Sequence, residues 1–207
     1  MRIIAGEFRG RTLRAPKGEG TRPTTDRVRE SIMSAVASAR GGFDGAVVLD
    51  AFAGSGALGF EALSRGARCA HFYERGGDAM KALLANAKAI GLGQQVARIH
   101  RADVLKEPPT RVRPPFDLVF LDPPYAFAPA DVLDLVASLR SAGALSDDAI
   151  IVYEHAPAAD GEVDDAGKAR DLSIARRKKY GDTVVDVLRA SCEEDACIAT
   201  EKERNLS

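Results

Sequence analysis

The sequence predicts an α/β fold in which a parallel sheet is covered by helices on both faces. Three observations predict it. Short apolar runs alternate with amphipathic helical segments from residue 46 onward, a glycine-rich loop follows the first run, and several runs end in a carboxylate. With 207 residues, 45% of them hydrophobic, the chain can build one domain with a full core, or one domain with a small appendage.

Residues 1–40 precede this alternation and predict a separate N-terminal extension. Two short stretches, "RIIAGEF" and "RTLRA", flank Arg9-Gly10, which indicates a hairpin turn. A Gly/Pro-rich link follows, and Thr24 and Thr25 can cap the helix after it. One face of that helix is apolar because hydrophobic residues recur every four positions, at Val28, Ile32 and Val36.

Residues 41–191 predict the main domain. Its expected parallel strands are "AVVLD", "CAHFYE", "VARIH", "FDLVFLD" and "AIIVYEH", and its helices are "ALGFEALSRG", "DAMKALLANAKAIG" and "DVLDLVASLR". The polar stretch from Ala156 to Ala169 is rich in Gly and Asp, and we expect a loop there. The following segment predicts a hairpin that turns at Gly181-Asp182. Residues 192–207 predict an acidic, flexible tail.

Charge and cysteine content narrow the classes of function. Eight basic and four acidic residues occupy positions 1–31, and a second basic cluster spans positions 176–179, although the net charge is only −1. Such patches favour a polyanionic partner, with a solvated charged surface as the alternative. Three cysteines without C-x-x-C spacing argue against a disulfide framework and a zinc site. The absence of a long apolar run or a signal-peptide core predicts a cytoplasmic protein without a membrane partner.

A glycine loop, residues 54–59, follows the first expected strand and opens a helix. Glycines there allow a sharp turn and a close approach to a ligand. The string also satisfies G-x-G-x-x-G, so a nicotinamide-dependent dehydrogenase is a competing interpretation. Asp50 directly precedes the loop, however, and a carboxylate there suits the cationic end of S-adenosylmethionine better than a pyrophosphate.

Carboxylates end three successive expected strands, at Asp50, Glu74 and Asp103. Each one alone is equally well explained as a helix cap, a loop anchor or a solvated strand end. Because the carboxyl ends of parallel strands meet at one edge of the sheet, where ligands bind in such folds, the three together predict a cofactor pocket.

The fourth expected strand ends in what we call the DPPY segment, Asp122, Pro123, Pro124 and Tyr125. Two prolines fix the backbone and remove two N–H donors, so their carbonyls can face a ligand. An amino group on a nucleobase is a poor nucleophile because its lone pair is delocalised. Asp122 and the Pro123 carbonyl can each accept one of its N–H bonds, and Tyr125 can stack on the base. A plain Pro-Pro turn is the alternative for this string in isolation.

At these motifs the chain resembles the bacterial 16S ribosomal RNA guanine-N2 methyltransferases of the RsmD type. The resemblance runs from Met1 to about Arg189 and rests on "MRIIAGEFRGRTL", "RPTTDRVRESI", "LDAFAGSGALGFEALSRGA" and "FLDPPY". It implies a Rossmann-like, class I S-adenosylmethionine-dependent methyltransferase domain with a small N-terminal extension. The implied sheet has seven strands, all parallel except one within Thr183 to Arg189.

The resemblance also implies roles for individual residues. The cofactor would be bound by Asp50, Phe52, Gly54, Ser55, Gly56, Leu58, Glu74, Asp103 and Val104, and no metal would be needed. The target amino group would be held by Asp122, Pro123, Pro124 and Tyr125. By the same resemblance, Arg22, Thr24 and Arg27 would lie near the mouth of the site and the RNA. On physical grounds, Arg9 and Arg11 could also neutralise phosphates, and Lys178 and Tyr180 could form the opposite wall. The expected partner is 16S ribosomal RNA within an assembling small subunit, and the expected state of the protein is a monomer. For each arginine alone, a structural lid is an equal alternative.

The leading hypothesis is therefore methyl transfer from S-adenosylmethionine to N2 of a guanine in 16S ribosomal RNA. A DNA adenine-N6 methyltransferase is the second enzyme hypothesis, although so short a chain has no separate DNA-recognition domain. An RNA-binding assembly factor with a vestigial cofactor pocket is the alternative from another class. The intact DPPY segment beside an intact glycine loop argues against it, and the dehydrogenase comes last.

Overall fold

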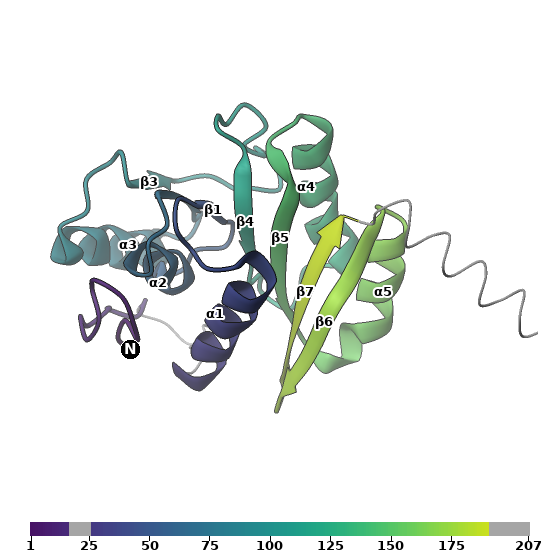
Figure 1. Cartoon of the computed structure of the whole chain (residues 1–207), viewed down its shortest axis with the longest axis horizontal. Coiled ribbons are helices and arrows are strands. Elements are labelled where there is room, and N and C mark those ends of the chain that lie inside the picture. The colour runs from purple at the N-terminus through teal and green to yellow at the C-terminus, as the bar shows by residue number, and fades with distance from the viewer. Residues whose placement is uncertain (17–25, 191–207) are drawn as a thin grey trace, which may run out of the picture.

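The computed structural model describes residues 1–16 and 26–190, which are built around a seven-stranded sheet of order β3-β2-β1-β4-β5-β7-β6 (Figure 1). Strands β1 to β5 pair in parallel, and β7 runs antiparallel to both of its neighbours. The expected single antiparallel strand within Thr183 to Arg189 is thereby confirmed. The strands are β1 (Val47–Asp50), β2 (Cys69–Tyr73), β3 (Ala97–His100), β4 (Phe116–Leu121), β5 (Leu145–His155), β6 (Leu172–Tyr180) and β7 (Thr183–Ala190).

Helices cover both faces of the sheet, as the alternation of patterns predicts. Helices α1, α2 and α3 pack on one face, and α4 and α5 pack on the other (Figure 1). Their bounds are α1 (Asp26–Arg40), α2 (Ala57–Ser64), α3 (Gly77–Ile90), α4 (Pro129–Ser141) and α5 (Asp160–Lys168), with a short 3₁₀ helix η1 (Pro157–Ala159) before α5.

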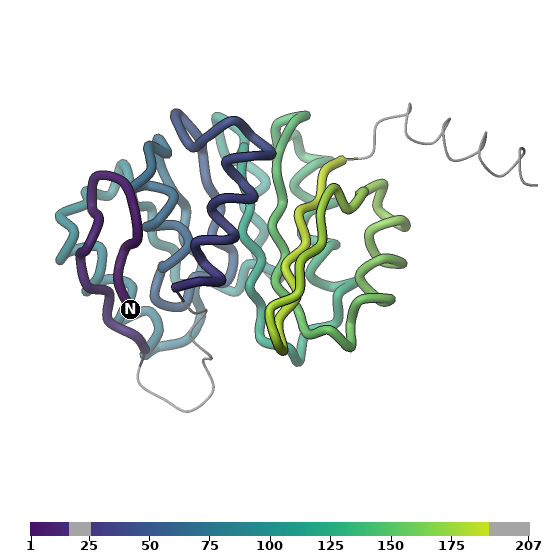
Figure 2. The backbone as a smooth tube through the Cα atoms, turned by 60° about the horizontal axis from the view of Figure 1, so that its bottom comes forward, coloured from purple at the N-terminus to yellow at the C-terminus, as the bar shows by residue number. Residues whose placement is uncertain are grey.

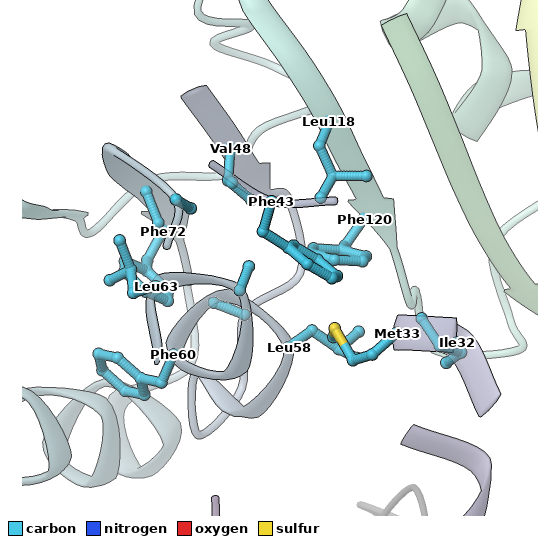
Figure 3. Packing of buried hydrophobic residues seen from close by; sticks show 14 of the residues in the cluster. Ile32, Met33, Phe43, Val48, Leu58, Phe60, Leu63, Phe72, Leu118 and Phe120 are labelled. Atoms are coloured by element: carbon cyan, nitrogen blue, oxygen red, sulfur yellow. The ribbon is translucent and has the colours of Figure 1, made fainter. Parts of the chain in front are cut away.

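Two hydrophobic cores follow from the alternation of side chains along the strands. Phe120 of β4 belongs to the core shared with α1, α2 and α3, whereas the next residue, Leu121, belongs to the core shared with α4 and α5. Figure 3 shows the first core, where Met33 of α1 and Leu58 of α2 approach Phe120. The central strands are buried on both faces, which explains why they read as continuous apolar runs.

Helix α5 corrects the expectation of a loop from Ala156 to Ala169. Asp160 and Glu162 lie in its first turn, where negative charge is favourable at a helix N-terminus. Its buried face consists of Val163, Ala166 and Gly167, spaced at i, i+3 and i+4. Because two of these three residues are small, the apolar face is difficult to detect in the sequence. The Gly and Asp content therefore favoured the prediction of a loop.

The N-terminal hairpin forms, with one isolated antiparallel bridge, Arg2 with Thr12, in place of two regular strands. Its arms are also joined by backbone hydrogen bonds of 3.0 Å, from the Ile3 N–H to the Arg11 carbonyl and from the Leu13 N–H to the Met1 carbonyl. The backbone bonds to the main domain as well. The N–H groups of Ile4 and Ala5 donate to the buried carboxylate of Glu61 at 2.8 and 3.0 Å. Glycine is required at position 6, because a Cβ there would lie 1.7 Å from the Ser64 carbonyl oxygen. Figure 2 shows this segment running alongside the helical layer.

Several expectations fall on residues outside the described ranges. They include the helix caps at Thr24 and Thr25 and the acidic tail. Helix α1 begins at Asp26, and Ile32 and Val36 of its expected apolar face are buried. Within residues 1–16 and 26–190, no helix combines the length and apolarity that crossing a membrane requires.

Candidate functional site

The principal cavity lies where the strand order reverses. From β1, the chain adds β2 and β3 on one side and then β4 on the other, so the loops after β1 and β4 separate from each other. Ligands bind at such switch points, outside the carboxyl ends of the strands. A cavity of about 650 Å³ occupies this position, a size typical of small-molecule sites.

Most of the predicted site residues line this one cavity. They are Asp50, Phe52, Gly54, Ser55, Leu58, Glu74, Asp103, Val104, Asp122, Pro123, Pro124 and Tyr125. Gly56 is not among the lining residues. It has a φ of 82°, and a Cβ there would lie 2.4 Å from Phe60 and 2.5 Å from Leu83. Its glycine is therefore needed for helix packing rather than for room in the cavity.

Asp50 is buried at the end of β1 and holds the start of α2. Its Oδ2 accepts a hydrogen bond from the Gly59 N–H at 3.0 Å, so the loop-anchor role considered from the sequence is present. Burial raises the pKa of Asp50 from 3.8 to about 7, and the negative charges of Asp122 and Glu74 add to this rise against the opposing effect of the Gly59 bond. The carboxyl group can therefore change its charge near neutral pH.

Glu74 ties together the loops that follow β1 and β2. Its Oε2 accepts from the Gly54 N–H at 2.8 Å, and its Oε1 accepts from the Gly76 N–H at 2.5 Å. These bonds hold the glycine loop against the second strand. An ionised carboxylate has about four lone-pair positions, so two backbone bonds leave acceptor capacity toward the cavity.

Asp103 lies beside an aromatic wall that the sequence did not predict. Its Oδ2 pairs with Arg75 at 3.0 Å, and the Arg75 guanidinium lies 5.2 Å from the ring centre of Phe127. The Phe127 ring in turn lies 6.0 Å from that of Phe52. Phe127 follows Tyr125 by two residues, so its position in the same loop was the available signal.

The DPPY segment is anchored to the turn between β6 and β7. The Tyr125 hydroxyl lies 3.1 Å from Thr183 Oγ1, while the side chain remains 52% exposed at the cavity. The Pro124 carbonyl accepts from the Phe127 N–H at 3.0 Å and closes the turn. The Pro123 carbonyl is thus the better candidate of the two proline carbonyls for an acceptor facing a ligand.

Two further charged residues line the cavity without having been predicted. Arg29 comes from α1 and is fully buried, and Glu154 comes from the end of β5 and is 7% exposed. The Arg29 guanidinium donates to the Arg2 carbonyl at 2.6 Å and to Asp26 at 2.9 Å. The N-terminal extension therefore contributes a wall of the cavity. Glu154 is the second-last residue of β5, close to the carboxyl end of its strand like Asp50 and Glu74, and this was the signal in the sequence.

The residues predicted to contact RNA fall into two described groups. Arg9 and Arg27 line a second cavity of about 320 Å³ in the extension, together with Arg2. Lys178 and Tyr180 of β6 both contact Ser31, which lies one helical turn from Arg27. Arg11 donates to the Ala89 carbonyl of α3 at 3.0 Å. Arg22 and Thr24 lie outside the described residues.

Across the part of the chain that the structure describes, no three acidic, histidine or cysteine side chains are grouped so as to hold a metal ion.

Comparison with known proteins places this site in a class. The solved structure of Escherichia coli yhhF superposes with a TM-score of 0.72 at 29% identity, covering 92% of this chain and 98% of that one. The sheet order and the cavity at its switch point define a Rossmann-like, class I methyltransferase fold.

The family follows from the sequence matches. A family model described as conserved hypothetical protein 95 matches residues 1–189. The ribosomal RNA small subunit methyltransferase D of Escherichia coli strain K12 is 37% identical over 155 residues, 74% of each chain. The YlbH protein of Bacillus subtilis strain 168 is 37% identical over 191 residues, 91% of this chain and 98% of that protein. The chain belongs to this family, the RsmD-type methyltransferases, as its motifs indicate.

Proposed function

We propose that this protein transfers a methyl group from S-adenosylmethionine to N2 of a guanine in 16S ribosomal RNA. The observation that carries the proposal is a single cavity bounded by the acid-led glycine loop on one side and by the DPPY segment on the other. The name of the Escherichia coli relative supports a ribosomal RNA substrate of the small subunit. We further propose that the reaction takes place in the cytoplasm, on a subunit during its assembly, and that the enzyme acts as a monomer.

The residues on the glycine-loop side fit S-adenosylmethionine. Gly54 has a φ of 55° and open space where a Cβ would lie, so the backbone can approach a ligand closely. Asp50 would face the cationic part of the cofactor, Glu74 would accept from the ribose hydroxyls, and Asp103 with Val104 would border the adenine. When bound, the cofactor supplies an electrophilic methyl group on a sulfonium.

The DPPY segment would prepare the amino group. Asp122 and the Pro123 carbonyl each accept one N–H of the guanine N2, which favours a pyramidal nitrogen with its lone pair directed at the methyl group. Tyr125 stacks on the base, worth roughly 1–3 kcal/mol. Positioning supplies most of the rate gain. A strong base is unnecessary, because the nitrogen becomes acidic once it is methylated and then releases its proton. The base must be unpaired or flipped out to reach this cavity.

The RNA would lie across the faces that carry the predicted basic residues. Arg9 and Arg27 on the extension and Lys178 on β6 are exposed, and Lys178 lies 5.1 Å from the Tyr180 ring centre. Phosphate contacts by these side chains would make RNA binding weaken steeply with salt.

Mapping of methylated nucleosides tests the proposal directly. Small-subunit RNA from cells with and without this protein is digested and analysed by mass spectrometry, and N2-methylguanosine at one position should depend on the protein. Calorimetry should show binding of S-adenosylhomocysteine and none of NADH. Binding of NADH alone would instead support the dehydrogenase, and N6-methyladenine in DNA would support the second enzyme hypothesis.

The raised pKa of Asp50 predicts a pH dependence of cofactor binding. Only the ionised carboxylate attracts the cationic cofactor, and the group is largely protonated below its pKa of about 7. Affinity should therefore rise by up to about tenfold per pH unit between pH 5.5 and 7 and then level off. Calorimetry in buffers of different ionisation enthalpy should detect release of the proton.

The same shift has a consequence for stability, with a defined sign. The folded state holds the Asp50 proton more tightly than the unfolded state, whose pKa is near 3.8. The contribution of this group to the stability of the protein without cofactor therefore decreases as the pH rises from about 4 to about 7. Asp50→Asn should remove both the pH dependence of cofactor affinity and the contribution of this group to the pH dependence of stability. A wild-type affinity that stays constant from pH 5.5 to 7 would contradict the assignment of Asp50.

A further inference from the structure

We propose that Glu154 selects guanine as the target base by accepting its N1–H, beside Asp122 holding the N2 amino group. This inference rests on the proposed function and deepens it, because the DPPY segment by itself suits any exocyclic amine. Guanine and adenine differ at the ring nitrogen next to the target edge: N1 of guanine carries a proton and donates, whereas N1 of adenine accepts.

The register of the sheet brings Glu154 beside the reaction centre. Leu121 of β4 pairs with Tyr153 of β5, so the next residues, Asp122 and Glu154, come level on neighbouring parallel strands. Neighbouring strands lie about 4.8 Å apart. The two side chains also project from the same face, since Phe120 and Val152, two residues earlier on each strand, share one core.

The cavity completes the arrangement. Asp122, Glu154 and Tyr125 all line it, so a base stacked on Tyr125 could present one edge to both carboxylates. Glu154 reaches this wall although it is only 7% exposed. Guanine offers two adjacent donor groups, N1–H and N2–H, whereas adenine would place the N1 lone pair against the Glu154 carboxylate.

Arg29 of α1 lines the same cavity. Its side chain is fully buried, and within residues 1–16 and 26–190 its Nε has no hydrogen-bond partner. The strand ends therefore contribute acceptors to the cavity, and α1 contributes a guanidinium. The Watson–Crick edge of guanine presents two donors, N2–H and N1–H, followed by the O6 acceptor.

The test uses the base 2-aminopurine, which keeps the exocyclic amine at C2 but lacks both N1–H and O6. Small-subunit RNA is prepared by ligation with either guanine or 2-aminopurine at the position that the wild-type protein methylates. The value of kcat/KM is then measured on both RNAs. The wild type should prefer guanine by about 100-fold, because a site built around a donor rejects analogues that lack it. Wild-type rates within about threefold of each other would overturn the inference.

The variant Glu154→Gln provides the second measurement, because its amide can donate to the N1 of 2-aminopurine. We expect kcat/KM for the guanine substrate to fall by roughly 30-fold. The ratio of kcat/KM for guanine to that for 2-aminopurine should fall to under about tenfold. Equal losses on both substrates would show that Glu154 acts only on the structure and would overturn the inference. Glu162→Gln, an exposed position on α5, is the matched control and should leave both rates unchanged.

Binding of S-adenosylhomocysteine by Glu154→Gln checks that the variant is folded. The wild-type comparison of the two bases needs no variant, so the inference stays testable if this one does not fold. Failure of the wild type to methylate any guanine would refute the proposed function, and this inference with it. Retained methylation of guanine without preference over 2-aminopurine would refute the role of Glu154 alone.

Discussion

Replacement of Asp122 by alanine should lower the rate of methyl transfer by about 10³-fold, equivalent to about 4 kcal/mol of barrier, while cofactor affinity changes by less than about threefold. The reason is that Asp122 belongs to the DPPY segment, which would hold the target amino group, whereas the glycine loop would hold the cofactor. Single-turnover transfer to small-subunit RNA and calorimetry with S-adenosylhomocysteine measure the two effects separately.

The matched control for this variant is Asp147→Ala. Asp147 is exposed at the start of β5, whereas the cavity lies beyond the carboxyl ends of the strands. This substitution removes the same charge and should leave transfer and binding unchanged. Turnover of Asp122→Ala near the wild-type value would show that the reaction centre is misassigned, and an equal loss of transfer and cofactor affinity would assign Asp122 to the cofactor instead.

Replacement of Glu61 by alanine should destabilise the protein by about 3–5 kcal/mol, the typical effect of breaking a buried ion pair. Glu61 is fully buried in α2, pairs with Arg65 at 2.9 Å, and accepts from two backbone N–H groups of the extension. Its removal leaves these donors without an acceptor. Urea unfolding followed by circular dichroism measures the change.

Glu7→Ala is the control for this second variant, because Glu7 is an exposed acidic residue of the same extension. Its effect should stay within about 0.5 kcal/mol. A loss below about 1 kcal/mol for Glu61→Ala would indicate that apolar contacts of Ile3 and Leu13 hold the extension without help from the carboxylate.

Predictions from the sequence succeeded where a pattern is local. Alternating apolar runs predict the strands and helices of the main domain because each run carries its own periodicity. The positions of Asp50, Glu74 and Asp103 follow equally well, since any residue at the carboxyl end of a parallel strand reaches the same edge of the sheet. The DPPY segment was predicted as a reaction centre because it ends the fourth expected strand of a sheet whose first strand leads into a glycine loop.

Contacts between distant residues explain what the sequence did not predict. The bond between Ile4 and Glu61 spans 57 residues and fixes the hairpin to α2, which no hairpin pattern indicates. In the sequence, Arg29 is one more basic residue of a charged helix. Its place in the cavity wall depends on its contacts with Met1 and Arg2, which lie far from it in the sequence. The place of Glu154 depends on the register between β4 and β5, which no local pattern specifies.

The half-exposed ring of Tyr125 makes the protein suited to an optical measurement. The chain contains no tryptophan, so Tyr125→Trp would introduce a single indole at the edge of the cavity. Stacking of a nucleobase on that indole should quench its emission, whereas binding of RNA elsewhere on the surface should not. Stopped-flow fluorescence could then time the arrival of the base separately from the docking of the RNA.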